Sequence, residues 1–142
     1  MQGMEVDMHR FRRSPLVFLP LLAVALWAPA AGAGTPAEQL SALSAQAGRS
    51  GIAVQGQQFF NAKHGREWSC ASCHNAQPTT GGKHASTGKA ISALAPAFNP
   101  ERFIDPAKTE KWFRRNCNDV LARVCTASEK ADVLAWLLTF KS

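Results

Sequence analysis

The stretch Cys70-Ala71-Ser72-Cys73-His74 decides the fold of this 142-residue chain. Two thiols three positions apart can form thioethers to the two vinyl groups of one porphyrin, and the imidazole that follows can reach the iron from one face. This C-x-x-C-H spacing is the attachment sequence for a c-type haem. We therefore expect one covalent haem c, with Cys70 and Cys73 as the thioether residues and His74 as the proximal iron ligand.

Three other uses of these thiols compete with haem attachment. A thioredoxin-like C-x-x-C needs a βαβ pattern around it, and the sequence has no strand-like run. A zinc site needs two further ligands at compatible spacing, whereas the remaining thiols, Cys117 and Cys125, are separated by seven residues. The third alternative is a haem-free protein in which Cys70 pairs with Cys73. The composition and the expected export favour haem.

The first 33 residues are typical of an export signal. Arg10, Arg12 and Arg13 form a basic region, an apolar run of twelve residues follows at 16–27, and Ala31-Gly32-Ala33 places small residues before a cleavage site. The alternative is an uncleaved membrane anchor. Proline and glycine residues leave too short a helical apolar run for that.

Export agrees with haem attachment, which in bacteria occurs outside the cytoplasmic membrane, in a compartment that also permits disulfides. We expect residues 1–33 to be a cleaved signal peptide and residues 34–142 to form one monomeric cytochrome c domain in the periplasm. Those 109 residues include thirteen basic and eight acidic side chains. The basic residues are scattered and no nucleic-acid motif accompanies them, so a protein partner with an acidic docking face is expected instead.

Helix signals dominate residues 34–142. Capping boxes begin at Thr35 and Thr126, and Asp105 precedes a proline at the first helical position. The predicted helices run from 36 to near 48, from about 51 to 60, from 107 to about 115 and from 127 to about 140. Gly56 lies one turn before Phe60, and we expect the second and last helices to cross there. An all-α fold of about four helices around one haem follows.

The sixth ligand of the iron is the functional question. All three methionines precede the expected cleavage site, so the mature chain has no methionine to bind the iron. The open alternatives are His64, His84, a lysine, an amide such as that of Asn116, or a vacant position. His64 lies only six residues before the first haem cysteine and is expected to be a solvated loop residue. His84 lies in a Gly/Ser/Thr stretch and is expected to be either a loop residue or a distal ligand.

The segment 111–118 occupies the place where a small cytochrome presents its distal ligand loop. Cys117 and Cys125, which haem does not need, can bridge across this turn, and the chain-entropy model gives such a closure about 2.5 kcal/mol. Four basic residues lie near the same loop, and they form either a docking face or a solvated helix side: Lys108, Lys111, Arg114 and Arg115.

At these residues the chain resembles the sphaeroides haem protein family, small high-spin class I cytochromes c with an asparagine as the sixth ligand. The likeness covers nearly the whole mature domain, and its most specific element is Arg115-Asn116-Cys117-Asn118 with the later Cys125-Thr126. The other matching stretches are 87–89, 94–96, 99–105, 110–112 and 129–137. Three positions depart from the family pattern: Ala93 replaces a usual Pro, Ala122 a usual Gly, and Val124 a usual acidic residue.

The resemblance implies a class I cytochrome c fold and particular roles for the distal residues. Asn116, directly before the first disulfide cysteine, would bind the ferric iron, and Asn118 is the less favoured choice. A carboxamide oxygen is a hard donor that ferrous iron holds loosely, so reduction would release it and admit O2, NO or CO. The family's partners are a dihaem cytochrome c and a membrane cytochrome b. The alternative function is a conventional electron carrier with a permanently six-coordinate haem, and terminal reduction of oxygen or nitrogen oxides is the enzymatic role left open.

Overall fold

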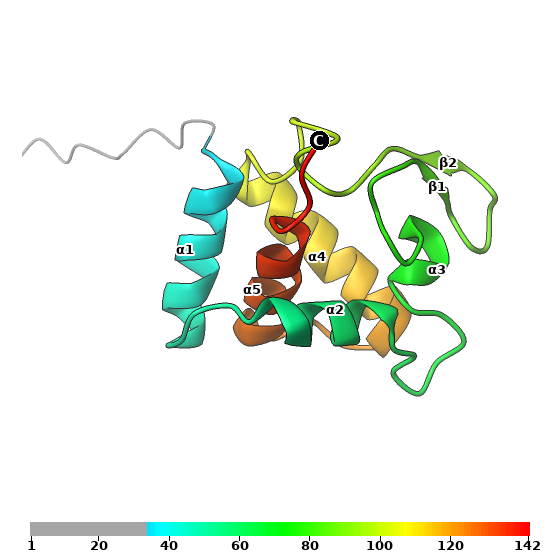
Figure 1. The fold of residues 1–142 in the computed structure, drawn as a ribbon. Helices are drawn as coiled ribbons and strands as arrows, with labels where there is room; N and C mark the ends of the chain where they lie inside the picture. Colours follow the sequence, from blue (N-terminus) through cyan, green and yellow to red (C-terminus); the bar gives the residue numbers. More distant parts are fainter. Residues whose placement is uncertain (1–33) are drawn as a thin grey trace, which may run out of the picture.

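The computed structural model describes residues 34–142, and the expected signal peptide lies outside the described residues. Within 34–142 the chain forms five helices and one antiparallel pair of short strands (Figure 1). The elements in chain order are α1 (Pro36–Ala47), α2 (Ala53–Asn61), α3 (Ala71–His74), β1 (Gly82–Lys83), β2 (Ala90–Ile91), α4 (Pro106–Leu121) and α5 (Ala127–Leu137). The predicted all-α class is confirmed. None of the described helices has the length and apolar character needed to cross a membrane.

Helices α1 and α5 begin at the predicted capping boxes. The hydroxyls of Thr35 and Thr126 accept hydrogen bonds of 3.2 Å from the N–H groups of Glu38 and Glu129. The two glutamate carboxylates in turn accept from the threonine N–H groups at 2.6 and 2.7 Å. This reciprocal pairing satisfies donors that the first turn of a helix leaves free. Gly48 ends α1 in the left-handed conformation with φ of 67°, a common helix terminus.

Helix α4 is longer than predicted. It runs to Leu121 instead of ending near Arg115, because its buried residues Thr109, Cys117 and Val120 keep a helical spacing beyond that point. The segment predicted as a distal ligand loop is therefore helical, and that prediction is wrong.

Three smaller features also differ from the prediction. The haem motif lies on a single helical turn of its own, α3, and the glycine-rich segment after it forms the β1–β2 pair. Helix α5 ends at Leu137, about one turn earlier than predicted.

Helices α2 and α5 cross at Gly56, as the sequence predicted. A Cβ atom at Gly56 would overlap the backbone carbonyl of Asp132, so only glycine permits this approach. The crossing packs Phe60 against Trp136, with ring centroids 4.9 Å apart. Phe60 is 1 % exposed and belongs to the same core cluster as Val133 and Trp136.

An ion pair fixes the connection between α1 and α2. The guanidinium of Arg49 donates to both carboxylate oxygens of Asp132, at 2.8 and 2.7 Å, and the N–H of Ile52 donates to the same carboxylate at 2.7 Å. These hydrogen bonds, those from Arg49 first, lower the pKa of Asp132. The start of α2 is thereby held against the middle of α5.

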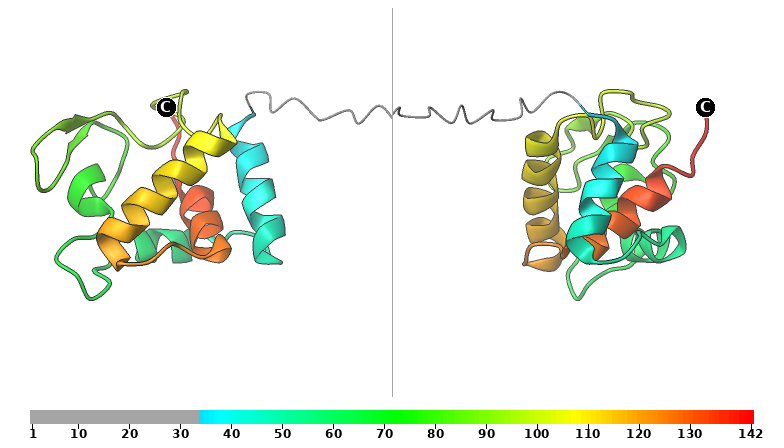
Figure 2. Two further views of the ribbon diagram at one scale, coloured as in Figure 1. Left: turned by 180° about the vertical axis from the view of Figure 1, so that it is seen from behind. Right: turned by 90° about the vertical axis from the view of Figure 1, so that its left-hand side faces the viewer.

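Helix α4 and the segment that carries the haem motif lie at different places around α1 and α5. In Figure 2 (right), α4 stands on the side of α1 and α5 opposite to α2. Figure 1 shows α3 and the two short strands to one side of the helices, beyond the end of α4. Residues from both segments line the same cavity.

Candidate haem site

A cavity of about 520 Å³ lies between the C-x-x-C-H turn and α4. Cys70, Cys73 and His74 line it from one side, and residues of α4 line it from the other. Its lining continues into the apolar core at Phe60 and Leu137. The volume lies within the range of about 300–1,000 Å³ that is typical of cofactor sites.

The C-x-x-C-H turn presents its three functional groups together. The N–H groups of Cys73 and His74 both donate to the carbonyl of Cys70, at 3.2 and 3.1 Å, so the motif closes one helical turn. Both haem cysteines are free thiols and partly buried, so the expected alternative of a disulfide between them is absent. Asn75 leaves the turn with φ of 65°, which redirects the chain.

Burial shifts the pKa of the thiol of Cys70 and of the imidazole of His74. Burial raises the pKa of Cys70 to about 11. Burial also lowers the pKa of His74 to about 4, and the positive charge of Arg102 adds to that effect. A buried imidazole is thus neutral at ordinary pH, which is the form that binds a metal ion. With two free thiols at the cavity, a neutral imidazole and apolar walls, the residues present fit a c-type haem.

Helix α4 lines the opposite wall. Thr109, Trp112, Asn116 and Val120 line the cavity at the spacing of three or four residues that places side chains on one helix face. Other α4 residues line the cavity as well: Lys108, Phe113, Arg115, Cys117 and Asp119.

The two asparagines of the distal segment are placed differently. Asn116 lines the cavity, whereas Asn118 is not among the described residues that do so, and both asparagines are exposed. The resemblance favoured Asn116, and its place in the cavity lining is consistent with that choice. Ligation by Asn116 remains a proposal.

The two histidines outside the motif are placed differently from each other. His64 Nε2 forms a hydrogen bond of 2.8 Å with the carbonyl of Phe59, and His64 is not among the described residues that line the cavity. His84 does line the cavity, and the N–H of Thr87 donates to its Nδ1 at 3.3 Å. The next residue along, Ala85, donates its N–H to the sulfur of Cys73 at 3.2 Å, so this hairpin lies beside the haem-motif thiol rather than on α4.

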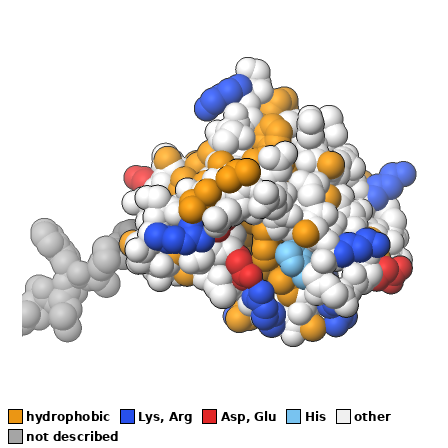
Figure 3. Space-filling model, turned by 60° about the horizontal axis from the view of Figure 1, so that its bottom comes forward, with side chains coloured by type: hydrophobic (Ala, Val, Ile, Leu, Met, Phe, Trp, Pro, Cys, Tyr) orange, Lys and Arg blue, Asp and Glu red, His pale blue; other side chains and the backbone are white. Residues whose placement is uncertain are grey.

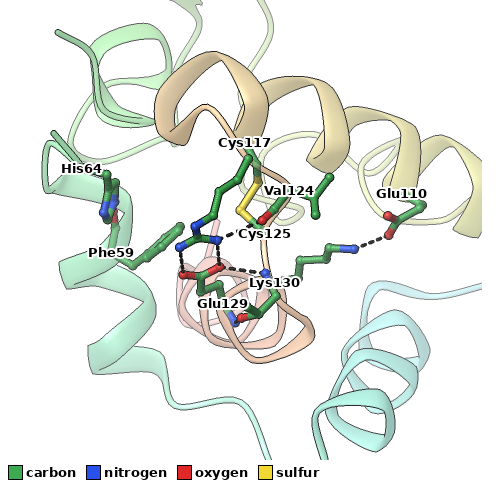
Figure 4. Close-up of a disulfide and its surroundings, with 10 residues drawn as sticks. Phe59, His64, Glu110, Cys117, Val124, Cys125, Glu129 and Lys130 are labelled. Carbon is green, nitrogen blue, oxygen red and sulfur yellow. Dashed lines mark hydrogen bonds and ion pairs between the residues drawn. A yellow bond between two sulfur atoms is a disulfide. The ribbon is translucent and has the colours of Figure 1, made fainter. Parts of the chain in front are cut away.

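A disulfide joins the end of α4 to the segment that leads into α5. Cys117 and Cys125 have a Cα–Cα distance of 5.6 Å, and each is 5 % exposed. Arg123, within the loop that this disulfide closes, donates from its guanidinium to both carboxylate oxygens of Glu129 in α5, at 2.9 and 2.6 Å. Figure 4 shows the disulfide with Glu129 beside it.

A further ion pair connects α4 to α5. Lys130 is 8 % exposed as a residue, and its Nζ donates to Glu110 at 2.6 Å (Figure 4). Together with the disulfide, it restrains α4 at two points, at Glu110 near its start and at Cys117 in its C-terminal half.

Two of the three departures from the family pattern have a visible structural setting. Ala122 ends α4 with φ of 58°, a left-handed conformation that favours glycine. The carbonyl of Ala93 accepts from Asn99 Nδ2 and from Arg102 Nε, each at 3.1 Å. Val124 is exposed.

Sequence reasoning assigned no role to Arg102 or Thr109, both of which line the cavity. Arg102 stood in a matching stretch, but only the fold brings it near His74. Among residues 34–142, no three His, Cys, Asp or Glu side chains are grouped to hold a metal ion between them, so the zinc alternative gains no support.

Comparison with known proteins gives consistent matches. The family model described as "Domain of unknown function (DUF1924)" matches residues 45–137. The cytochrome c-type protein SHP of Cereibacter sphaeroides is 44% identical over 124 residues, which are 84% of this chain and 95% of that protein. Cytochrome c'' of Methylophilus methylotrophus is 48% identical over 90 residues, which are 61% of this chain and 62% of that protein.

Solved structures agree. The structure of oxidised SHP, described as an oxygen binding cytochrome c, has a TM-score of 0.71 and 42% identity, and covers 77% of this chain and 100% of its own. Oxidised cytochrome c'' has a TM-score of 0.66 and 36% identity, with coverage of 75% and 95%. A solution structure of cytochrome c'', which concerns haem-ligand detachment, has a TM-score of 0.65 and 37% identity, with coverage of 75% and 94%. The predicted cytochrome c fold is confirmed.

Proposed function

The chain belongs to the SHP family of c-type cytochromes, and from this membership we propose that it is a mono-haem electron-transfer protein whose sixth iron ligand is exchangeable. When bound, haem c supplies an iron that alternates between ferric and ferrous states and can take up a diatomic gas. Thioethers from Cys70 and Cys73 would hold the ring, and His74 would bind the iron from the proximal side.

The observation that carries this proposal is the position of Asn116. Its side chain comes from α4, across the cavity from His74, and both residues line that cavity. The carboxamide oxygen of Asn116 is a neutral, hard donor, suited to ferric iron and weakly held by the softer ferrous ion. Asn116 would therefore bind in the oxidised protein and leave on reduction.

Relatives support an exchangeable ligand. SHP is described as an oxygen binding cytochrome c, and one study of cytochrome c'' concerns haem-ligand detachment. We extend both properties to this chain: a high-spin ferric form with Asn116 bound, and a ferrous form open to O2, NO or CO. Terminal reduction of oxygen or nitrogen oxides would use the same open position.

A conventional carrier is the second candidate. His84 also lines the cavity, and a second imidazole at the iron would give a permanently six-coordinate haem. Its hairpin contacts Cys73 rather than α4, which favours Asn116.

Electron exchange needs a docking surface near the site. Four basic residues are exposed on α4: Lys108, Lys111, Arg114 and Arg115. The guanidinium of Arg115 lies over the ring of Trp112, at 5.6 Å from the ring centroid. Trp112 lines the cavity and is 40 % exposed. This basic and aromatic surface suits an acidic face on a dihaem cytochrome c or a membrane cytochrome b in the periplasm. On the face shown in Figure 3, by contrast, basic side chains are scattered, so we do not propose nucleic acid as a partner.

Optical spectra of the purified holoprotein test the proposal. The wild type should be high-spin when oxidised and should take up CO rapidly when reduced. Asn116→Ala should alter the ferric spectrum, and Asn118→Ala, a matched change on another side of the same helix, should leave it unchanged. A ferrous form that is low-spin and refuses CO would contradict the exchangeable ligand. A haem stain on a denaturing gel tests covalent attachment, which Cys70→Ala and Cys73→Ala should weaken.

A further inference from the structure

Arg102 is a half-buried cation in the cavity wall. Burial lowers the pKa of Arg102, although the charge of Glu101 opposes that effect. Its Nε donates to the carbonyl of Ala93 at 3.1 Å and its Nη2 donates to the carbonyl of Ser92 at 3.2 Å. Both partners are neutral backbone groups.

No carboxylate of the described chain pairs with this guanidinium. The ion pairs found within residues 34–142 are Arg49–Asp132, Arg123–Glu129 and Lys130–Glu110. A charge that loses contact with water is unfavourable unless an opposite charge compensates it. Arg102 thus makes no ion pair with the described residues, although Glu101 and Asp105 also line the cavity.

The guanidinium also has free donors. It carries five N–H groups in a planar fork that matches a carboxylate. Nε and Nη2 use their bonds to the carbonyls to fix the orientation of the plane, and Nη1 has no hydrogen-bond partner in residues 34–142. The guanidinium can therefore bind one carboxylate through the N–H groups that these two hydrogen bonds leave free.

We propose that Arg102 binds a propionate carboxylate of haem c and so orients the ring and raises its reduction potential. The inference rests on the proposed function, because it requires haem in this cavity. Haem c brings its own carboxylates, so they are the anions that attachment at Cys70 and Cys73 would carry into the same space. Lys108 also lines the cavity, but it is exposed, and its ammonium can remain hydrated.

The backbone around this contact is braced toward the proximal side. Ser92 and Ala93, which hold Arg102, are followed by Leu94 and Ala95, whose N–H groups both donate to the carbonyl of Pro78 at 3.1 and 3.0 Å. Pro78 is fully buried and lies four residues after His74. Arg102 is thus a positioning residue. The backbone segment that accepts its hydrogen bonds is itself held by Pro78, close to the proximal ligand in the sequence.

The positive charge of Arg102 gives the inference an electrochemical signature. Ferric haem carries one more positive charge than ferrous haem, so a nearby cation disfavours the ferric state. Removal of that cation by Arg102→Gln should lower the midpoint potential. Arg66→Gln is the matched control, because Arg66 is exposed, does not number among the described residues that line the cavity, and loses the same charge.

The experiment measures midpoint potential and the haem-propionate bending bands of the resonance Raman spectrum for the holoprotein and its variants. We expect Arg102→Gln to lower the potential by clearly more than Arg66→Gln and to shift the bending bands. Arg102→Lys keeps the charge but not the fork, so it should shift the bands while the potential stays close to that of the wild type. If the Arg102→Gln protein cannot be obtained with haem attached, the bending bands of Arg102→Lys alone test whether Arg102 binds a propionate.

Two results would overturn the inference. One is a potential for Arg102→Gln equal to that of Arg66→Gln, with wild-type bending bands. The other is a set of wild-type bands in Arg102→Lys. Failure of the proposed function is distinct from both, because a wild-type protein without covalent haem or with a CO-inert ferrous form would show it directly.

Discussion

Replacement of Gly56 by alanine should destabilise the domain even though alanine is the better helix former. In the interior of a helix, glycine to alanine favours the helix by about 1 kcal/mol. Here the new Cβ would overlap the backbone carbonyl of Asp132, which no side-chain rotation can relieve. Overpacking of a tight core costs about 1–3 kcal/mol, and a clash with backbone lies at the upper end of that range.

The balance is a loss of about 2 kcal/mol in the free energy of unfolding, or about 8–10 °C in Tm for a domain of this size. Urea denaturation of the oxidised holoprotein, followed by circular dichroism, measures it. Gln57→Ala is the control, because Gln57 is exposed on the same helix. If Gly56→Ala were as stable as the control, then α2 and α5 would not approach each other at this point and the reasoning would be refuted.

The other predictions concern the end of α4 and the Arg49–Asp132 pair. The double variant Cys117→Ala/Cys125→Ala should lose about 2.5 kcal/mol of stability to urea, while its ferric spectrum stays that of the wild type, because the buried Val120 and the Lys130–Glu110 pair still hold α4 in place; a changed spectrum would show that the bridge itself positions the distal residue. Ala122→Gly should raise the free energy of unfolding by about 0.5–1 kcal/mol, since it relieves a left-handed alanine at φ of 58°; equal or lower stability would mean that the alanine is unstrained. The pKa of Asp132 is lowered by Arg49, so its carboxylate contributes stability above its unfolded pKa of about 4, and this contribution is lost as the pH falls through the lowered folded pKa. Urea midpoints between pH 7 and pH 3 should therefore fall less in Asp132→Asn than in the wild type, and parallel curves would refute this.

Local signals in the sequence predicted most of the fold. Capping residues Thr35 and Thr126 mark the starts of α1 and α5 because the bonds they make lie within one helical turn. Gly56 predicted the helix crossing, since only a missing side chain allows two backbones to meet so closely.

The end of α4 was harder to predict because packing decides it. Asparagines in the run at 116–118 have weak intrinsic helix preference, and the predicted helix ended just before them, near Arg115. Contacts of Cys117 and Val120 with the rest of the domain override that preference. The role of Arg102 was also hidden, since its carbonyl partners and its place in the cavity arise only from the tertiary fold.

The helical form of the distal segment changes what opening the iron would require. Asn116 lies on helix α4, which the Cys117–Cys125 disulfide connects to the segment before α5 and the Lys130–Glu110 ion pair connects to α5 itself. If Asn116 binds the iron as proposed, departure of the amide would need only rotation about its own two side-chain torsions, with no change in the backbone of α4. Crystals or NMR spectra of the two oxidation states should accordingly superimpose along the backbone of residues 106–121 and differ at one side chain.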